Sequence, residues 1–228
     1  MRFRLKPLSW PIANGVGLSV GFTIALAITP TGAEDAAFNL VWPIAGLSLA
    51  GAQLAASTFA RHHYIRWALT GTIAPFVGIP IGVALAFYTL GFLPDFGARP
   101  DSPALTYILI ALFGGFPGGM AGLCTGLLVA AGQLPAIPVA SELRTPWLLS
   151  TSFGWCASGA IFGVLVILAL PLNHANPFDW AYRLLPLSLS AFIAGTTFGF
   201  ISRRQFSRLQ TLNSSSSPQP YVNSRADR

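Results

Sequence analysis

The feature that most constrains this chain is a series of six long apolar stretches whose central parts carry no charged residue. A helix needs about 20 predominantly apolar residues to cross the hydrocarbon core of a bilayer. The six stretches lie near residues 10–29, 39–60, 67–93, 104–131, 147–171 and 183–202. They are rich in Leu, Ala, Gly and Phe and lack the alternation of a membrane barrel. We therefore expect an all-α integral membrane bundle of six transmembrane helices.

Composition supports a single membrane domain followed by a polar tail. Hydrophobic residues make up 53% of the 228 residues and charged residues only 9%, whereas soluble domains carry about a quarter charged residues. The links between the stretches are short, so we expect one domain over residues 1–204, built as three helical hairpins at about 10–60, 67–131 and 147–202. The Ser- and Pro-containing segment 205–228 predicts a disordered cytoplasmic tail.

The first stretch admits a second interpretation. The basic segment 1–6, the apolar run and the small residues Thr31, Gly32 and Ala33 also fit a cleaved secretory signal peptide. The full spanning length of the stretch favours a retained helix, and the alternative stays open.

Charge placement predicts the orientation. Of the 13 Lys and Arg residues, 11 lie on the side of the two termini in the six-helix arrangement and two on the other. Because basic loops stay cytoplasmic, both termini are expected in the cytoplasm, in a bacterial plasma membrane or a thylakoid. The net charge of +6 is then a topology signal and not a nucleic-acid signal. The expected partners are membrane lipids, and another membrane protein or a homo-oligomer is compatible.

An internal repeat is indicated by residues that match at an offset of 80. The matches include Gly46 with Gly126, Gln53 with Gln133, and Trp67 with Trp147. Trp10 opens the first helix after a basic segment in the same way. These features predict three parallel hairpin repeats around an axis along the membrane normal, with chance matching in a biased composition as the alternative. We expect the three tryptophans, Trp10, Trp67 and Trp147, to anchor the helices at the membrane interface.

The repeated frame also carries a family resemblance. The frame Gly46…Gln53…Trp67, with its copy Gly126…Gln133…Trp147, resembles a loose group of small multi-pass membrane proteins common in cyanobacteria. In that group a Gly-rich helix ends in Gln and a Trp-led helix follows; the likeness covers residues 45–82 and 118–163. This chain lacks the usual Trp after each Gln and has Leu134-Pro-Ala-Ile-Pro in place of the second basic stretch. The group has no assigned biochemistry, so the resemblance implies a fold and no activity.

Small and polar residues supply the candidate packing and binding positions. Four glycines share one face of the fourth helix: Gly114, Gly118, Gly122 and Gly126. Spacing of four permits close helix approach, and we expect the first or fifth helix as partner; a wall beside a ligand and a homodimer face are alternatives. Four polar residues are interior candidates: Gln53, Gln133, Thr72 and Ser152. They are expected either to hydrogen-bond between helices or to form one wall of a small polar site.

The sequence carries no catalytic signature. It lacks a phosphate loop, a His-Glu-x-x-His motif and a Gly-x-Ser-x-Gly elbow, and ion-coupled carriers normally need a charged residue inside the spans. We therefore expect no enzyme, no catalytic residue, no metal and no cofactor. The leading hypothesis is a non-enzymatic structural, assembly or partner-binding role. A small-solute permease or the substrate-capture subunit of a transporter is the alternative, and a membrane-sensing role is a third.

Overall fold

The computed structural model describes residues 9–28, 34–56, 64–91, 103–136, 141–169 and 180–215. The α-helices are α1 (Ser9–Ile28), α2 (Glu34–Ala55), α3 (Tyr64–Leu90), α4 (Pro103–Ile110), α5 (Phe116–Gln133), α6 (Arg144–Ala169) and α7 (Trp180–Ser215). The short elements are the π-helix η2 (Ala111–Gly115) and the 3-10 helices η3 (Leu134–Ala136) and η4 (Ser141–Leu143). Because α4, η2 and α5 are continuous, the described residues form six long helices and contain no strand. The expected all-α bundle of six helices is confirmed.

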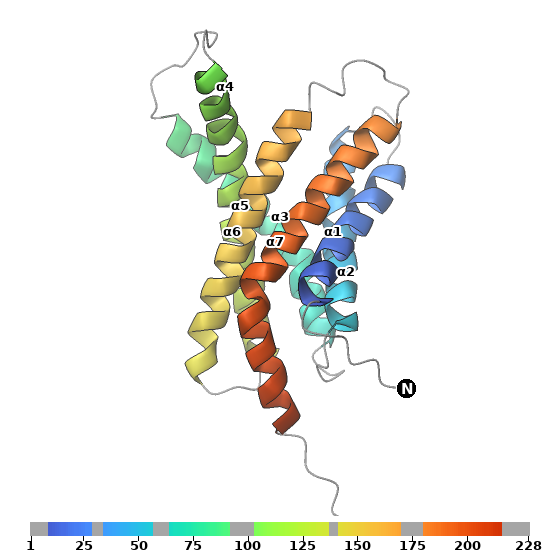
Figure 1. Cartoon of the computed structure of the whole chain (residues 1–228), viewed down its shortest axis with the longest axis vertical. Helices are drawn as coiled ribbons and strands as arrows, with labels where there is room; N and C mark the ends of the chain where they lie inside the picture. Colours follow the sequence, from blue (N-terminus) through green and yellow to red (C-terminus); the bar gives the residue numbers. More distant parts are fainter. Residues whose placement is uncertain are drawn as a thin grey trace, which may run out of the picture.

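The six helices form a closed ring. Consecutive helices pack against each other in the order α1, α2, α3, α5 and α6, then α7, and α7 returns to pack against α1. The hairpins α1–α2, α3–α5 and α6–α7 are therefore joined side by side into a ring. Figure 1 shows the start of α1 and the end of α7 at the same, lower end of the bundle.

The outer surface of the ring has the character of a lipid-facing surface. Five helices contain stretches long and apolar enough to cross a membrane: Trp10–Ile28, Ile65–Leu90, Tyr107–Gln133, Arg144–Leu168 and Leu185–Thr211. The apolar part of α2, Leu40–Ala55, is shorter, although its 22 helical residues extend about 33 Å. On α1 the exposed apolar side chains recur every four residues: Ile12, Val16, Val20, Ile24 and Ile28. Such a stripe on one helix face is what contact with lipid requires.

A proline explains the irregular middle of the fourth span. Pro117 lies at the start of α5 and has no N–H to donate to the carbonyl four residues earlier. The preceding turn is a π-helix, in which the Phe116 N–H bonds to the Ala111 oxygen five residues back. The wider turn lets the helix continue past the proline.

The four glycines of the fourth span lie against α6. A Cβ built at Gly118 would overlap the carbonyl oxygen of Gly159, and one at Gly122 would overlap that of Trp155. At Gly114 the added Cβ would lie 2.8 Å from the Gly163 oxygen. The fifth long helix, one of the two expected partners, is therefore the one that this face contacts at backbone distance.

Helix α7 is longer than the sequence suggested. The tail was expected to begin at residue 205, but the helix continues to Ser215. Phe206 and Leu209 are buried, and the Phe206 ring stacks on Trp10 with 3.6 Å between ring centroids. The prediction is therefore wrong for residues 205–215, because apolar side chains three residues apart hold this polar-looking segment against α1. Residues 216–228 lie outside the described part of the chain.

Candidate functional site

The three helix-opening tryptophans meet inside the ring. Trp10, Trp67 and Trp147 are only 2%, 3% and 1% exposed, and they share one buried cluster with Phe198 and Phe206. The Trp67 and Trp147 rings are 5.7 Å apart between centroids. The expectation that they anchor the bundle at the membrane interface is wrong, because buried indoles cannot reach lipid headgroups. They form an aromatic layer across the end of the ring where the described chain begins and ends.

A chain of hydrogen bonds runs through this layer and connects four helices. The Trp67 indole N–H donates to Gln53 Oε1 (2.7 Å), and the Gln53 amide donates to Asn14 Oδ1 (2.7 Å). Asn14 in turn donates to the Trp10 carbonyl (2.7 Å), and the Trp10 indole donates to Ser202 Oγ (2.9 Å). The predicted interior residue Gln53 is therefore buried and bonded on both sides of its amide.

The other predicted polar residues behave differently. Thr72 donates to the Ala68 carbonyl of its own helix (2.8 Å) and does not take part in the chain of hydrogen bonds described above. Gln133 and Ser152 are buried, and Gln133 Oε1 and Ser152 Oγ have no hydrogen-bond partner among the described residues. The structure thus separates the four candidates into two that are satisfied by protein groups and two that retain unpaired atoms.

Three glycines pack against the Trp-led helices in the same way. A Cβ at Gly46, Gly126 or Gly195 would lie 2.5, 3.1 or 2.5 Å from a carbonyl oxygen, that of Gly71, Thr151 or Asn14 respectively. In each case that carbonyl belongs to the residue four positions after a tryptophan, Trp67, Trp147 or Trp10. The Cα of the next residue lies 2.9, 2.9 or 3.0 Å from the same Cβ. The three contacts are similar, although at Gly126 the nearest atom is the Trp155 Cβ at 2.7 Å, and the internal repeat stays a prediction.

The ring contains a partly open cavity of about 250 Å³ to which every long helix contributes. Its lining includes Leu18 and Phe22 of α1, Trp42 of α2, Ile79 and Val83 of α3, Thr125 of α5, Trp155 and Phe162 of α6, and Ala194 of α7. Leu18 and Trp155 each follow the tryptophan of the aromatic layer by eight residues, or about 12 Å along the helix. The cavity therefore lies beyond the aromatic layer, away from the chain ends.

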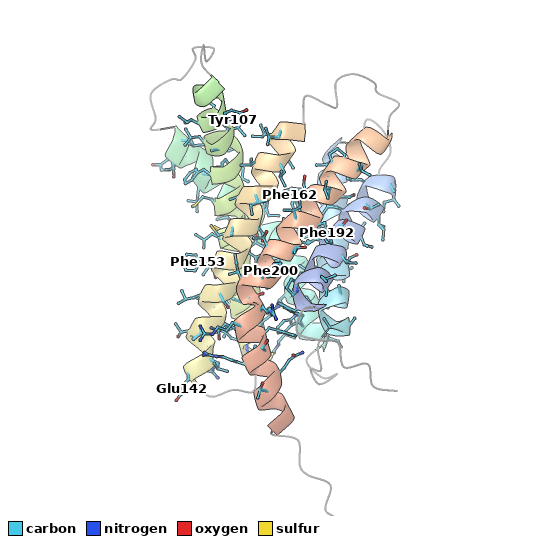
Figure 2. The ribbon with its side chains drawn as sticks, in the orientation of Figure 1. Tyr107, Glu142, Phe153, Phe162, Phe192 and Phe200 are labelled. Carbon is cyan, nitrogen blue, oxygen red and sulfur yellow. The ribbon has the colours of Figure 1, made fainter. Side chains whose placement is uncertain are left out.

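The cavity lining is mainly aromatic and aliphatic, and none of the described residues that form it is charged. Phe22 packs against Phe162 and Trp42, at 5.1 and 5.4 Å between ring centroids. Figure 2 labels Phe162, which lines the cavity, and also Phe153 and Phe200, whose side chains are exposed on the outer surface. A neutral, largely apolar molecule fits such a lining, because a charge would lose its hydration without a partner.

Two buried polar atoms belong to residues of the lining. The Trp155 indole N–H and the Thr125 hydroxyl are buried and have no hydrogen-bond partner within the described ranges. The Ser158 hydroxyl lies 2.7 Å from both the Gly154 and Ala194 carbonyls and is satisfied. Neither of the two unpaired atoms is exposed to the cavity, so the surface that the cavity presents to a solute is almost entirely apolar.

The sequence did not identify the cavity residues as a set. Thr125 was visible only as an isolated hydroxyl one residue before Gly126, and Trp155 only as part of a Gly-Trp step. Within the described residues, no group of three or more His, Cys, Asp or Glu side chains is placed to hold a metal ion.

Comparison of the chain with family models, with curated proteins and with solved structures finds no match.

Proposed function

We propose that this multi-pass membrane protein binds a small, neutral, largely apolar solute inside its ring and acts as a permease or substrate-capture component. The observation that carries the proposal is the cavity bounded by all six long helices. The sequence alone favoured a structural or assembly role, because it showed no coupling or catalytic residue. A scaffold has no need of an internal cavity, since close packing is the more stable arrangement.

The size and lining of the cavity limit the solute. An apolar protein cavity of about 150 Å³ accommodates benzene, so about 250 Å³ suits a bicyclic molecule. The cavity exposes almost no polar surface, so an apolar solute without a charged or strongly polar group fits best.

We place both chain ends in the cytoplasm, following the uneven distribution of basic residues. The aromatic layer then closes the cytoplasmic end of the ring, and the cavity lies nearer the opposite side of the membrane. This is the arrangement of a component that takes up its solute from outside.

Quinoline and naphthalene form a matched pair of probes, because they have the same shape and only quinoline has an acceptor nitrogen. Binding to the protein in lipid nanodiscs is measured by the change in tryptophan fluorescence, with empty nanodiscs as reference. We expect both to bind and naphthalene to bind at least as tightly as quinoline, because the cavity exposes almost no polar surface that could pair with the quinoline nitrogen.

A matched pair of variants tests whether the probes enter the ring. Val83 lines the cavity, so Val83→Phe should fill part of it and weaken binding. Val20 is exposed on the outer surface, so Val20→Phe should leave binding unchanged. Equal binding to the wild type and both variants would place the probes in lipid, and the proposal would fail in favour of the structural role.

A further inference from the structure

The aromatic layer can be divided into three stations, one for each hairpin. Each station contains three residues. The first lies four positions after the tryptophan that opens the hairpin, and the second lies seven positions after the packing glycine of that hairpin, which is Gly46, Gly126 or Gly195. The third is the tryptophan that opens the next hairpin. The first station is Asn14, Gln53 and Trp67; the second is Gly71, Gln133 and Trp147; the third is Thr151, Ser202 and Trp10. The common packing of Gly46, Gly126 and Gly195 makes the three stations structurally comparable.

The first station shows how such a set is satisfied by protein groups alone. Asn14 Oδ1 accepts from the Gln53 amide N–H, and this bond turns Gln53 Oε1 toward Trp67. The Trp67 indole then donates to that oxygen at 2.7 Å. In the third station the Trp10 indole finds its acceptor in Ser202.

The second station lacks the residue that orients the amide. Gly71 stands where Asn14 stands in the first station and offers no side chain to Gln133. Gln133 and Trp147 are 2% and 1% exposed, yet Gln133 Oε1 and Trp147 Nε1 have no hydrogen-bond partner in the part of the chain that the structure describes. These are the same two atom types that bond directly in the first station.

The chemistry of the two atoms specifies what can join them. An indole N–H only donates and an amide oxygen only accepts. A bridging group must therefore accept one hydrogen bond and donate another, and the smallest group that does both is a hydroxyl. Leaving both atoms unpaired in the interior would forfeit the desolvation energy of each.

We propose that the second station binds a hydroxyl group, from water or from a small alcohol, that accepts from the Trp147 indole N–H and donates to Gln133 Oε1. The site lies in the aromatic layer, about 12 Å along α6 from Trp155 in the cavity wall. It stands independently of the solute proposed for the cavity, because neither Gln133 nor Trp147 lines that cavity.

Proton NMR of the full chain with ¹⁵N-labelled tryptophan indoles, in nanodiscs, tests the proposal. The Trp147 signal is assigned by its loss in Trp147→Phe, and Trp67, bonded to Gln53, is the internal control. Magnetisation transfer from water to the Trp147 N–H, and not to the Trp67 N–H, identifies bound water. If this transfer is absent and the addition of 1-butanol causes a saturable shift of the Trp147 N–H signal alone, the site binds an alcohol. Neither effect, or the same effect at both indoles, overturns the proposal.

A second variant converts the station to the bonded type. A Cβ at Gly71 would meet nothing closer than 3.7 Å, so a side chain can begin there without overlap, and Gly71→Asn introduces the acceptor that the second station lacks. We expect it to orient Gln133, let Trp147 donate to Gln133 directly and abolish the hydroxyl signal. The control Gly51→Asn introduces the same residue on α2 where a Cβ meets nothing within 4 Å.

The two variants are compared by thermal unfolding as well as by NMR. Gly71→Asn should unfold about 2–4 °C above Gly51→Asn, the shift expected for one additional hydrogen bond. An unchanged hydroxyl signal at Trp147 in Gly71→Asn would overturn the proposal.

Discussion

Alanine substitutions along one turn of α5 should have opposite effects that follow the α5–α6 contact. At Gly118 an added Cβ would overlap the Gly159 carbonyl, and at Gly122 it would overlap the Trp155 carbonyl. At Gly119 the nearest atom is the Ala160 Cβ at 3.5 Å, which is ordinary contact. The three positions have the same residue type and the same helix, so they differ mainly in what the new methyl group meets.

The magnitudes follow from two opposing terms. Replacing Gly by Ala in a helix gains up to about 1 kcal/mol in propensity, and at Gly119 this gain should appear as higher stability. At Gly118 and Gly122 the obstacle is a backbone carbonyl, so the two helices must separate. A gap of about 0.5–1 Å forfeits a quarter to a half of each van der Waals contact along the interface, and overpacking typically costs about 1–3 kcal/mol. We expect a net loss of about 1–2 kcal/mol at both positions.

Thermal unfolding in one detergent, followed by tryptophan fluorescence, checks this series. The reference is Gly51→Ala, since Gly51 is exposed and has no neighbour within 4 Å. Stability at Gly118→Ala and Gly122→Ala equal to that of Gly119→Ala would show that the two backbones are not in close contact. The packing argument for this face would then be refuted.

Three further predictions concern the aromatic layer and the topology. Phe206→Ala should cost about 3–5 kcal/mol, because the ring stacks on Trp10, whereas Phe200→Ala, on the exposed surface, should stay within ~1 kcal/mol in the same unfolding assay. Gln53→Met removes both hydrogen bonds of a buried amide and should lower stability by about 1–3 kcal/mol; unfolding at the wild-type temperature would contradict the bonded layer. Reporter fusions at the C-terminal end and within residues 94–100 should label opposite sides of the membrane, and labelling on one side would contradict the six-helix topology.

An exposed basic residue lies directly beside a buried tryptophan of the aromatic layer. Arg66 precedes Trp67 and is exposed, while Trp67 itself is buried. One residue can therefore lie at the headgroup level while its neighbour points into the ring, since adjacent helix positions differ by about 100° around the axis. The exposed Arg66 and the buried aromatic layer are therefore at the same level along the bundle.

The sequence determined the number of long helices and their type. The length of an apolar stretch can be counted in the sequence, and a stretch long enough to cross the bilayer is expected to form one spanning helix. The glycine face of 114–126 was equally readable, because the helical period places residues four apart on one side. Gln53 was placed in the interior on the same local grounds, since an amide in lipid needs partners.

Local patterns failed where the direction that a side chain faces, or its partner, had to be known. Trp10, Trp67 and Trp147 follow basic segments and fit interface anchors, but position along a helix gives depth and not the direction a side chain faces. Residues 205–215 contain enough Ser and Arg to resemble a tail, and only the presence of Trp10 opposite Phe206 makes the segment a helix with a buried side.

Only the tertiary structure decided that the ring has an interior with a cavity. In a soluble protein the apolar side of a helix marks the core. In a membrane bundle the side that faces lipid is apolar as well, so hydrophobicity does not show which side of a helix faces inward. That direction is fixed when α7 returns to α1 and closes the ring. Closure brings Thr125 and Ala194, 69 positions apart in the chain, to the wall of one cavity.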